Sequence, residues 1–293
     1  MNSRELREVQ RLLKGFGLRP RKGLGQSFLI AQEIMERIVA AAELDPEDVV
    51  LEVGAGLGRM TRLLAEKAGR VVAIELDERL VKILDRTLSD LPNVEIVQGN
   101  ILEFDPARNP LLAACRSYKV VGNLPYYITS AILRHFLEAK VKPKLMVVTV
   151  QEEVAQRIVA KPGEMSLLAV SVQFYGQPRI VARIPASSFY PPPEVDSAVV
   201  RIDFYERPPI GVEDVKGFFK VVRAGFSQRR KQLHNALSAG LGIPDGEVKE
   251  TLHRAGVDPG RRAQTLSLEE WGRVYRALSL RFRPQCQGLN LAG

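Results

Sequence analysis

The stretch that decides the fold is Val49-Val50-Leu51-Glu52-Val53-Gly54-Ala55-Gly56-Leu57-Gly58, in a chain of 293 residues. Its first half is apolar apart from Glu52 and predicts a short buried strand, and three glycines at alternate positions predict a tight turn after it. Apolar residues at helical spacing follow, so we expect a helix over residues 58–68. A strand, a glycine loop and a helix in this order present backbone amides to a ligand. A tight turn that binds nothing is the alternative, and the loop alone does not exclude it.

The chain beyond this stretch continues to alternate between strands and helices. We predict strands over residues 70–75, 94–97, 119–122 and 145–150, with helices over 77–88 and 130–138. Almost continuously apolar strands separated by helices predict a parallel sheet that is buried on both faces. Right-handed crossovers make such a sheet doubly wound. The fold class is therefore predicted to be α/β, with a Rossmann-like domain.

The pattern changes after about Pro178. Strands are predicted over residues 179–184 and 197–204, on either side of the proline-rich Phe189 to Pro193. Arg207-Pro208-Pro209 then predicts a linker.

Helical periodicity dominates after the linker. We predict helices over residues 212–225, 228–239, 246–255 and 268–278. Ser267 and Glu270 form a capping box before the last of them. The chain is thus predicted to have a larger domain over residues 1–206, with a basic N-terminal arm, and a smaller helical domain over residues 207–293 with a disordered tail from Arg281.

The net charge of +8 is concentrated at the two ends of the chain. Residues 1–24 carry 7 basic and 2 acidic side chains, residues 207–293 carry 15 and 8, and residues 25–206 carry 20 and 24. Basic ends around a slightly acidic body are suited to hold a polyanion beside an active site. A generic solvated surface is the alternative.

Composition also bounds the compartment. The two cysteines, Cys115 and Cys286, are far apart, which excludes a disulfide framework and a zinc site, and we expect no metal. The apolar runs are shorter than the roughly 20 residues that span a bilayer, and the charged N-terminus is no signal peptide. We therefore expect a cytoplasmic protein that does not contact a membrane.

The glycine loop and the next strand indicate the cofactor. The loop has the spacing G-x-G-x-G, whereas a dinucleotide fingerprint requires G-x-G-x-x-G. After an acidic residue, this spacing is typical of enzymes that bind S-adenosylmethionine, which carries a carboxylate and no pyrophosphate. Glu75 ends the second strand, where a carboxylate can accept hydrogen bonds from both ribose hydroxyls; the alternative is an exposed charge at a strand end. Asn100, after the third strand, is a candidate for contact with the adenine amine of the cofactor.

Asn123-Leu124-Pro125-Tyr126 follows the fourth strand, at the edge of the sheet where ligands of such folds bind. The Asn123 side-chain carbonyl and the Leu124 backbone carbonyl can accept the two hydrogens of an exocyclic amine, which keeps its lone pair free to attack a methyl group. Pro125 fixes its own φ and favours an extended Leu124. Tyr126 offers a ring on which a flipped base can stack, and Phe189 is a candidate for the opposite face of that base. An Asn-Pro turn with packed aromatic residues is the alternative.

Together these motifs make the chain resemble the small-subunit ribosomal RNA adenine dimethyltransferase family. The resemblance covers roughly residues 21–278 and includes Gly25-Gln26-Ser27-Phe28-Leu29, Glu52 to Gly58, Gly122 to Tyr127, Ser188 to Arg201 and Phe226 to Leu233.

The resemblance implies an enzyme that uses S-adenosyl-L-methionine. It would transfer four methyl groups to N6 of two adjacent adenines near the 3′ end of 16S rRNA, with the 30S ribosomal subunit as its partner and the enzyme as a monomer. Residues 1–206 would be the methyltransferase domain, and residues 207–293 would bind RNA or the ribosome.

The resemblance also implies site residues by motif position. Two of them depart from the usual pattern of the family: Ser27 stands in place of Asn or His, and Asn100 stands in place of Asp but keeps an acceptor oxygen. The implied cofactor contacts are Ser27, Leu29, Gly54, Gly56, Glu75, Asn100 and Asn123. The implied RNA contacts are Arg229, Arg230 and Lys231 at the start of a predicted helix, and Lys22 in the N-terminal arm.

Three alternatives remain open at this point. The erythromycin-resistance methylases act on large-subunit RNA with a similar catalytic domain, but their tetrapeptide more often carries Ile than Leu, and they lack the pattern from Phe226 to Leu233. A ribosome-assembly factor whose essential act is binding is the second alternative. A DNA adenine methylase is the third, and the helical domain argues against it.

Overall fold

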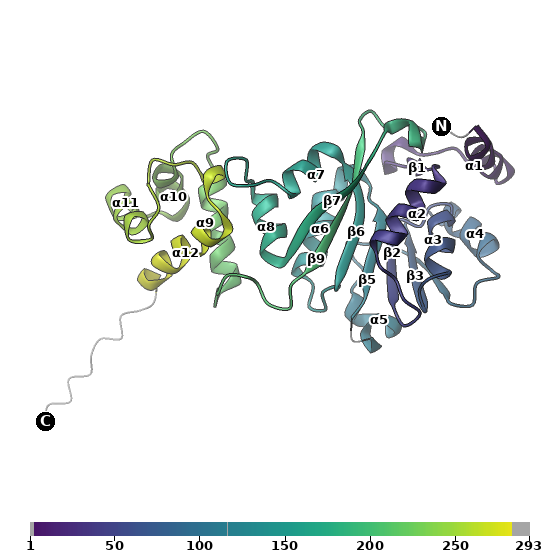
Figure 1. Cartoon of the computed structure of the whole chain (residues 1–293), viewed down its shortest axis with the longest axis horizontal. Coiled ribbons are helices and arrows are strands. Elements are labelled where there is room, and N and C mark those ends of the chain that lie inside the picture. Colours follow the sequence, from purple (N-terminus) through teal and green to yellow (C-terminus); the bar gives the residue numbers. More distant parts are fainter. Residues whose placement is uncertain (1–2, 116, 283–293) are drawn as a thin grey trace, which may run out of the picture. The chain divides into compact units, whose positions relative to one another are not determined.

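The computed structural model describes residues 3–115 and 117–282 and divides the chain into two compact units (Figure 1). The first unit contains the residues up to 159 together with residues 171–206. The second contains residues 160–170 and the residues from 207 onward. The predicted division at residue 206 places residues 160–170 in the wrong unit. They belong to the helical unit because the amides of Gly163 and Met165 donate to the carbonyl of Gln264, at 2.9 and 3.0 Å.

The first unit contains, within the described residues, a seven-stranded sheet in the order β4-β3-β2-β5-β6-β9-β7. The strands from β4 to β6 are parallel, and β9 runs antiparallel to both β6 and β7. The predicted α/β class and the largely parallel sheet are therefore confirmed. The strands are β2 (Val49–Val53), β3 (Arg70–Glu75), β4 (Val94–Gln98), β5 (Lys119–Asn123), β6 (Leu145–Gln151), β7 (Gly176–Ile184) and β9 (Ser197–Phe204).

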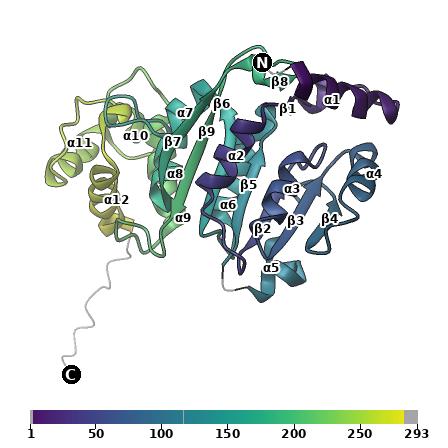
Figure 2. The ribbon, with the colours of Figure 1, turned by 45° about the vertical axis from the view of Figure 1, so that its right-hand side comes forward.

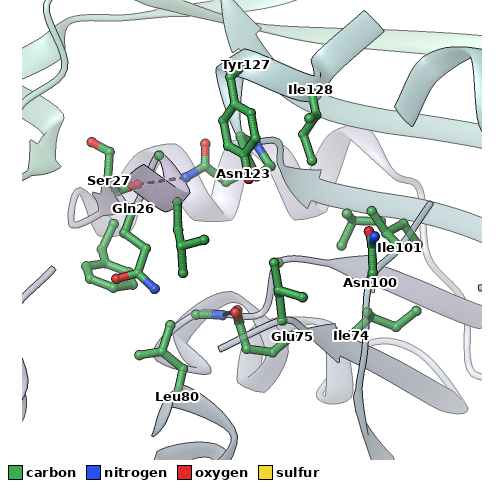
Figure 3. A pocket seen from close by; sticks show the side chains of 18 of the residues that line it. Gln26, Ser27, Ile74, Glu75, Leu80, Asn100, Ile101, Asn123, Tyr127 and Ile128 are labelled. Carbon is green, nitrogen blue, oxygen red and sulfur yellow. Dashed lines mark hydrogen bonds between the residues drawn. The ribbon is translucent and has the colours of Figure 1, made fainter. Parts of the chain in front are cut away.

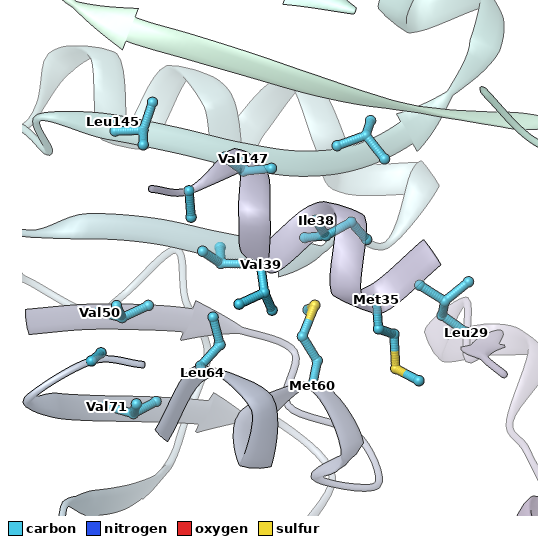
Figure 4. Close-up of a cluster of buried hydrophobic side chains, with 14 of the residues drawn as sticks. Leu29, Met35, Ile38, Val39, Val50, Met60, Leu64, Val71, Leu145 and Val147 are labelled. Atoms are coloured by element: carbon cyan, nitrogen blue, oxygen red, sulfur yellow. The ribbon is translucent and has the colours of Figure 1, made fainter. Parts of the chain in front are cut away.

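Helices cover the sheet on both faces (Figures 1 and 2). Consecutive residues of β5 and β6 are buried, which requires cover on both sides. On one face, Met35 and Ile38 from α2 and Leu64 from α3 pack against Val50 and Val147 of the sheet (Figure 4). The helices of this unit are α1 (Ser3–Gly15), α2 (Gln32–Ala41), α3 (Arg59–Ala65), α4 (Glu78–Thr87), α5 (Pro110–Ala114), α6 (Thr129–Glu138) and α7 (Glu152–Ile158). A further helix, α8 (Leu167–Tyr175), crosses the division between the units.

The second unit is helical. Its centre is Trp271, which is fully buried and lies 5.5 Å from the ring of Phe226 between centroids. The predicted capping box is confirmed, because the Glu270 amide donates to Ser267 Oγ at 3.2 Å and the Ser267 amide donates to Glu270 Oε2 at 2.8 Å. The helices are α9 (Val215–Phe226), α10 (Leu233–Leu241), α11 (Asp245–Arg254) and α12 (Leu268–Phe282). The tail is predicted to be disordered from Arg281, but α12 contains Arg281 and ends only at Phe282. Residues 283–293 lie outside the described residues.

One predicted helix begins at the wrong residue. The sequence predicts a helix over residues 228–239, but α9 ends at Phe226 and α10 begins only at Leu233. Arg229, Arg230 and Lys231 therefore lie in the intervening turn. Three adjacent cations at a helix N-terminus would oppose the positive end of the helix dipole, which explains the later start.

The described part of the chain contains no helix that is both long enough and apolar enough to cross a bilayer.

Candidate active site

A pocket lies in the first unit, where β2, β3 and β5 end (Figure 3). The space between its walls is about 720 Å³, which includes a part that is open to solvent. Residues 24–28 form part of its lining. The predicted site residues that line it are Ser27, Gly54, Gly56, Glu75, Asn100, Asn123 and Pro125.

The glycine loop forms the floor of the pocket. Gly54, Gly56 and Gly58 all have positive φ values, between +60° and +75°, which residues with a side chain rarely adopt. A Cβ atom at Gly58 would also lie 2.9 Å from the side chain of Leu84 in α4. The loop therefore requires glycine both for its backbone conformation and for the close approach of α4.

Glu75 is buried at the end of β3, and its carboxylate is oriented by two backbone amides. Oε2 accepts from the Gly56 amide and Oε1 from the Asp77 amide, both at 2.9 Å. Burial raises the pKa of Glu75, and the two backbone hydrogen bonds oppose that rise. Each oxygen keeps a second lone pair, so the carboxylate can accept from two adjacent hydroxyl groups at the pocket.

Gln26 and Asp77 also contribute to the site, although no site role is predicted for them from the sequence. The Gln26 side chain also lines the pocket, and its Nε2 donates to Asp77 Oδ2 at 2.9 Å. The Arg79 guanidinium beside Asp77 holds the pKa of that carboxyl far below its ordinary value. Asp77 caps α4 by accepting from the Arg79 amide, and an Asp directly before a helical pattern is the signal that could have identified it.

The two polar atoms of the Asn123 side chain, Nδ2 and Oδ1, differ in their hydrogen bonding. Its Nδ2 donates to the Ser27 carbonyl at 3.0 Å, and this hydrogen bond is drawn in Figure 3. Its Oδ1 is buried and has no hydrogen-bond partner among the described residues. A buried acceptor without a partner is costly, and such groups in native proteins commonly await a ligand or water. Asn123 Oδ1, which is predicted from the sequence to accept an amine hydrogen, is thus the atom without a partner among the described residues.

Two neighbouring tyrosines follow this residue. Tyr126 is half-buried, and its hydroxyl lies 2.6 Å from the Ser197 hydroxyl. Burial raises the pKa of Tyr126, and the bond to Ser197 lowers it in part. Tyr127 lines the pocket and is 59% exposed, although no role was assigned to it from the sequence.

Phe189 lies in the core and not in the lining of the pocket. It is only 2% exposed and belongs to the apolar cluster under the sheet. It starts β8 (Phe189–Tyr190), which pairs with β1 (Phe28–Leu29) and sets Phe189 opposite Leu29. The Ser27 hydroxyl donates to the Pro191 carbonyl at 2.6 Å, so residues 27–29 and 189–191 are joined beside the pocket.

A second, smaller cavity adjoins the pocket and holds Glu52. Leu29, Gly54 and Asn123 line it as well. Glu52 is fully buried, and neither carboxylate oxygen has a hydrogen-bond partner within residues 3–115 and 117–282. Burial raises the pKa of Glu52 to about 8; the neighbouring Thr61 hydroxyl opposes this rise, and the nearby charge of Glu75 adds to it. The carboxyl is therefore mainly protonated at neutral pH.

The remaining predicted residues are placed as follows. Asn100 lines the pocket, its Oδ1 accepts from the Leu102 amide at 3.1 Å, and its Nδ2 donates to Glu103 at 3.0 Å. The described part of the chain holds no cluster of side chains that could bind a metal ion. Lys22 begins the short helix η1 (Lys22–Leu24), and its side chain lies outside the described residues. Arg229, Arg230 and Lys231 are all exposed in the turn before α10.

The fold and the pocket define the class of the protein. A doubly wound sheet carries a glycine loop after β2, a buried carboxylate at the end of β3 and Asn123-Leu124-Pro125-Tyr126 from the end of β5. This is the arrangement of a Rossmann-like methyltransferase. The model of the ribosomal RNA adenine dimethylase family matches residues 17–279, and the chain belongs to that family. The resemblance seen in the sequence is thereby confirmed.

Curated relatives cover almost the whole chain. It is 50% identical over 268 residues to ribosomal RNA small subunit methyltransferase A of Dehalococcoides mccartyi (strain CBDB1), with 91% of each chain covered. It is 44% identical to the protein of the same name from Moorella thermoacetica, with 91% of this chain and 95% of the relative covered.

Solved structures agree on the fold. The 23S rRNA methyltransferase ErmE is 31% identical, with a TM-score of 0.70, over 86% of this chain and 99% of its own. A dimethyladenosine transferase from Plasmodium falciparum is 23% identical, with a TM-score of 0.76, over 87% of this chain and 98% of its own.

Proposed function

We propose that this enzyme transfers methyl groups from S-adenosyl-L-methionine to N6 of two adjacent adenines near the 3′ end of 16S rRNA, giving N6,N6-dimethyladenine in the 30S ribosomal subunit. Membership of the ribosomal RNA adenine dimethylase family supports the reaction, and the names of the curated relatives support the small subunit. The observation that carries the proposal is the buried Asn123 Oδ1, which has no partner among the described residues.

The pocket residues fit the proposed cofactor. The Glu75 carboxylate has lone pairs for the two ribose hydroxyls, and the loop at Gly54 and Gly56 lets a ligand approach the backbone. Asn100 would contact the adenine amine, and Ser27 and Leu29 would lie beside the ligand. When bound, S-adenosylmethionine supplies an electrophilic methyl group on a positively charged sulfur.

Asn123 and Leu124 would orient the target amine. The Asn123 Oδ1 accepts one N6 hydrogen and the Leu124 carbonyl accepts the other, so the nitrogen lone pair points away from both. The hydrogen bond from Asn123 Nδ2 to Ser27 fixes the amide before the base arrives. Catalysis then comes mainly from orientation and from acceptors that are already in place. The amine can lose its proton after the transfer, so the first step needs no general base.

Aromatic residues would hold the flipped base. The Tyr126 ring stacks on one face of it, and the contact with Ser197 fixes the ring. Phe189 would stack on the opposite face, which requires it to leave the buried position that it occupies in this structure.

The second unit would bind the substrate. Its exposed Arg229, Arg230 and Lys231 would contact phosphates, with Lys22 of the N-terminal arm adding a further contact. The first unit would then carry catalysis, and the second unit would contribute to binding of the substrate. We propose that the enzyme acts in the cytoplasm, where its ribosomal substrate lies, and that it acts as a monomer.

The test is to map methylated nucleotides in 16S rRNA by mass spectrometry. Cells that lack this protein should lose dimethylation of the two adenines, and the wild-type gene should restore it. The similarity to ErmE makes the large subunit the competing substrate. Purified enzyme should therefore be assayed on unmethylated 30S and 50S subunits, and transfer to 50S alone would overturn the proposal.

A further inference from the structure

The apolar face of α1 anchors this helix beside the pocket. Val9 and Leu13 are buried in a cluster with Phe28 and Leu80. Phe28 and Leu80 also line the pocket, so α1 packs against residues that form the wall of the pocket. Figures 1 and 2 both show α1 close to β1. The helix is therefore a fixed element next to the site.

The opposite face of α1 is basic. Arg4, Arg7, Arg11 and Lys14 recur at intervals of three and four residues, and all four are exposed. At about 100° per residue they lie within about 80° of one another, on the side of the helix away from Val9. We call these four residues the basic face of α1.

The acidic residues of α1 leave most of this charge unpaired. Glu5 accepts a hydrogen bond from the Gln32 amide at 2.9 Å, and Glu8 pairs with Arg4 at 3.1 Å. Arg7, Arg11 and Lys14 form no ion pair in the described part of the chain. Like charges three or four positions apart repel one another and weaken a helix. A bound polyanion would remove that repulsion.

We infer that Arg7, Arg11 and Lys14 form a phosphate-binding surface for the ribosomal RNA backbone that flanks the target adenines. This inference rests on the proposed function, which requires an RNA strand to enter the pocket beside α1. Arg19 and Arg21, which lie in the chain between α1 and the residues that line the pocket, are also exposed and add positive charge to this segment. The partner is RNA rather than an acidic protein because the base bound in the pocket stays joined to its own phosphates.

The test compares two triple charge reversals in the full chain. In the first, Arg7, Arg11 and Lys14 are changed to Glu. In the matched control, Arg70, Lys140 and Lys144 are changed to Glu; these exposed residues lie at or just before the amino ends of β3 and β6, away from the carboxyl ends of the strands that form the pocket. Affinity for unmethylated 30S subunits and for protein-free 16S rRNA is measured at several salt concentrations.

We expect the α1 variant to bind both substrates at least 10-fold more weakly at about 0.1 M salt, and the salt slope of log K to fall by about 2 to 3. The control variant should stay within about 3-fold of wild type. Equal losses of affinity in the two variants would show that the effect depends only on net charge and would overturn the inference. A loss on 30S subunits without a loss on free rRNA would assign the surface to a protein partner.

A variant with Gln in place of Arg7, Arg11 and Lys14 keeps the test decisive if the reversal fails to fold. It should lose part of the affinity and of the salt slope, and wild-type binding by this variant would overturn the inference. The inference and the proposed function fail separately, because dimethylation of 30S subunits by the wild-type enzyme tests only the latter.

Discussion

Asn123 carries the sharpest prediction at the scale of single residues. Its Nδ2 is held by Ser27 and its buried Oδ1 is left for the substrate. Changing Asn123→Ala removes an acceptor that is already in position, and the loss of one such group typically lowers rates by about 100- to 1,000-fold. Single-turnover transfer of labelled methyl groups to unmethylated 30S subunits measures this rate, and binding of 30S should change little.

Asn123→Asp is the matched control for that experiment. It keeps an oxygen at the position of Oδ1 but cannot donate to the Ser27 carbonyl, so we expect an intermediate rate. An alanine variant that dimethylates adenine within about threefold of the wild-type rate would show that the assigned mechanism is wrong.

Glu52 is a second residue whose chemistry can be measured. Its pKa of about 8 in the folded chain lies above the ordinary value of 4.5, so the folded chain binds more protons between these pH values. The stability that the protonated carboxyl brings is complete below about pH 4.5 and is lost progressively as the pH rises to about 8. The slope is at most about 1.4 kcal/mol per pH unit.

We therefore expect the difference between Glu52→Gln and wild type to depend on pH. Gln cannot ionise, so its free energy of unfolding relative to wild type should increase from pH 5.5 to 7.5. Urea denaturation at several pH values, with the cofactor absent, measures this difference. A constant offset between the two proteins across that range would contradict a protonated Glu52.

At the scale of elements, the segment from η1 to β1 supports the pocket through a contact with the start of α4. Gln26 joins it to Asp77, whose amide in turn holds Glu75. Gln26→Ala removes a hydrogen bond to a charged acceptor, which is typically worth about 1.5–3 kcal/mol. Only part of this free energy affects ligand binding, because Gln26 acts on the ligand through Asp77 and Glu75. We therefore expect the affinity for S-adenosylhomocysteine, measured by calorimetry, to fall about 3- to 10-fold.

Gln26→Glu sharpens this test because it sets a second carboxylate against Asp77. It should weaken the ligand more than Gln26→Ala does, and high salt should relieve part of the loss. Equal affinities for wild type and both variants would mean that the Gln26–Asp77 contact does not support the pocket.

The strands were predictable because their signal is local. Predicted bounds match β2, β3 and β9, since a strand buried on both faces is a continuous apolar run in the sequence. The helix α1 was not predicted, although Val9 and Leu13 are spaced for a helix, because its charged residues suggested only a basic arm. The start of α10 was misplaced because Arg229, Arg230 and Lys231 would oppose the positive end of the helix dipole, an effect that outweighs helix propensity there.

Contacts within the site were less predictable than the residues that form it. The glycine loop, Glu75 and Asn123 were identified because a residue type at a strand end indicates its chemistry. The pairing of Gln26 with Asp77 joins positions 51 residues apart, and no local pattern encodes it. The burial of Phe189 likewise depends on the pairing of β8 with β1.

At the scale of the whole molecule, the two units offer separate probes. Trp271 is the only tryptophan of the chain and lies in the second unit, so its fluorescence reports on that unit. A Cβ atom at Gly225 would lie 2.4 Å from the Trp271 ring. Overpacking of this kind costs about 1–3 kcal/mol. Gly225→Ala should therefore lower the midpoint of the fluorescence transition in urea and leave the affinity for S-adenosylhomocysteine in the first unit within about twofold.

Gly246→Ala in α11 is the matched control, because nothing lies within 4 Å of the added Cβ and its φ is not positive. Alanine in a helix is favoured over glycine by up to about 1 kcal/mol, so this variant should keep or raise the midpoint. If Gly225→Ala lowered the affinity for S-adenosylhomocysteine by clearly more than about twofold while it lowered the fluorescence midpoint, the two units could not be treated as separate in stability. Unchanged transitions in both variants would instead mean that α9 can move away from Trp271 at no cost.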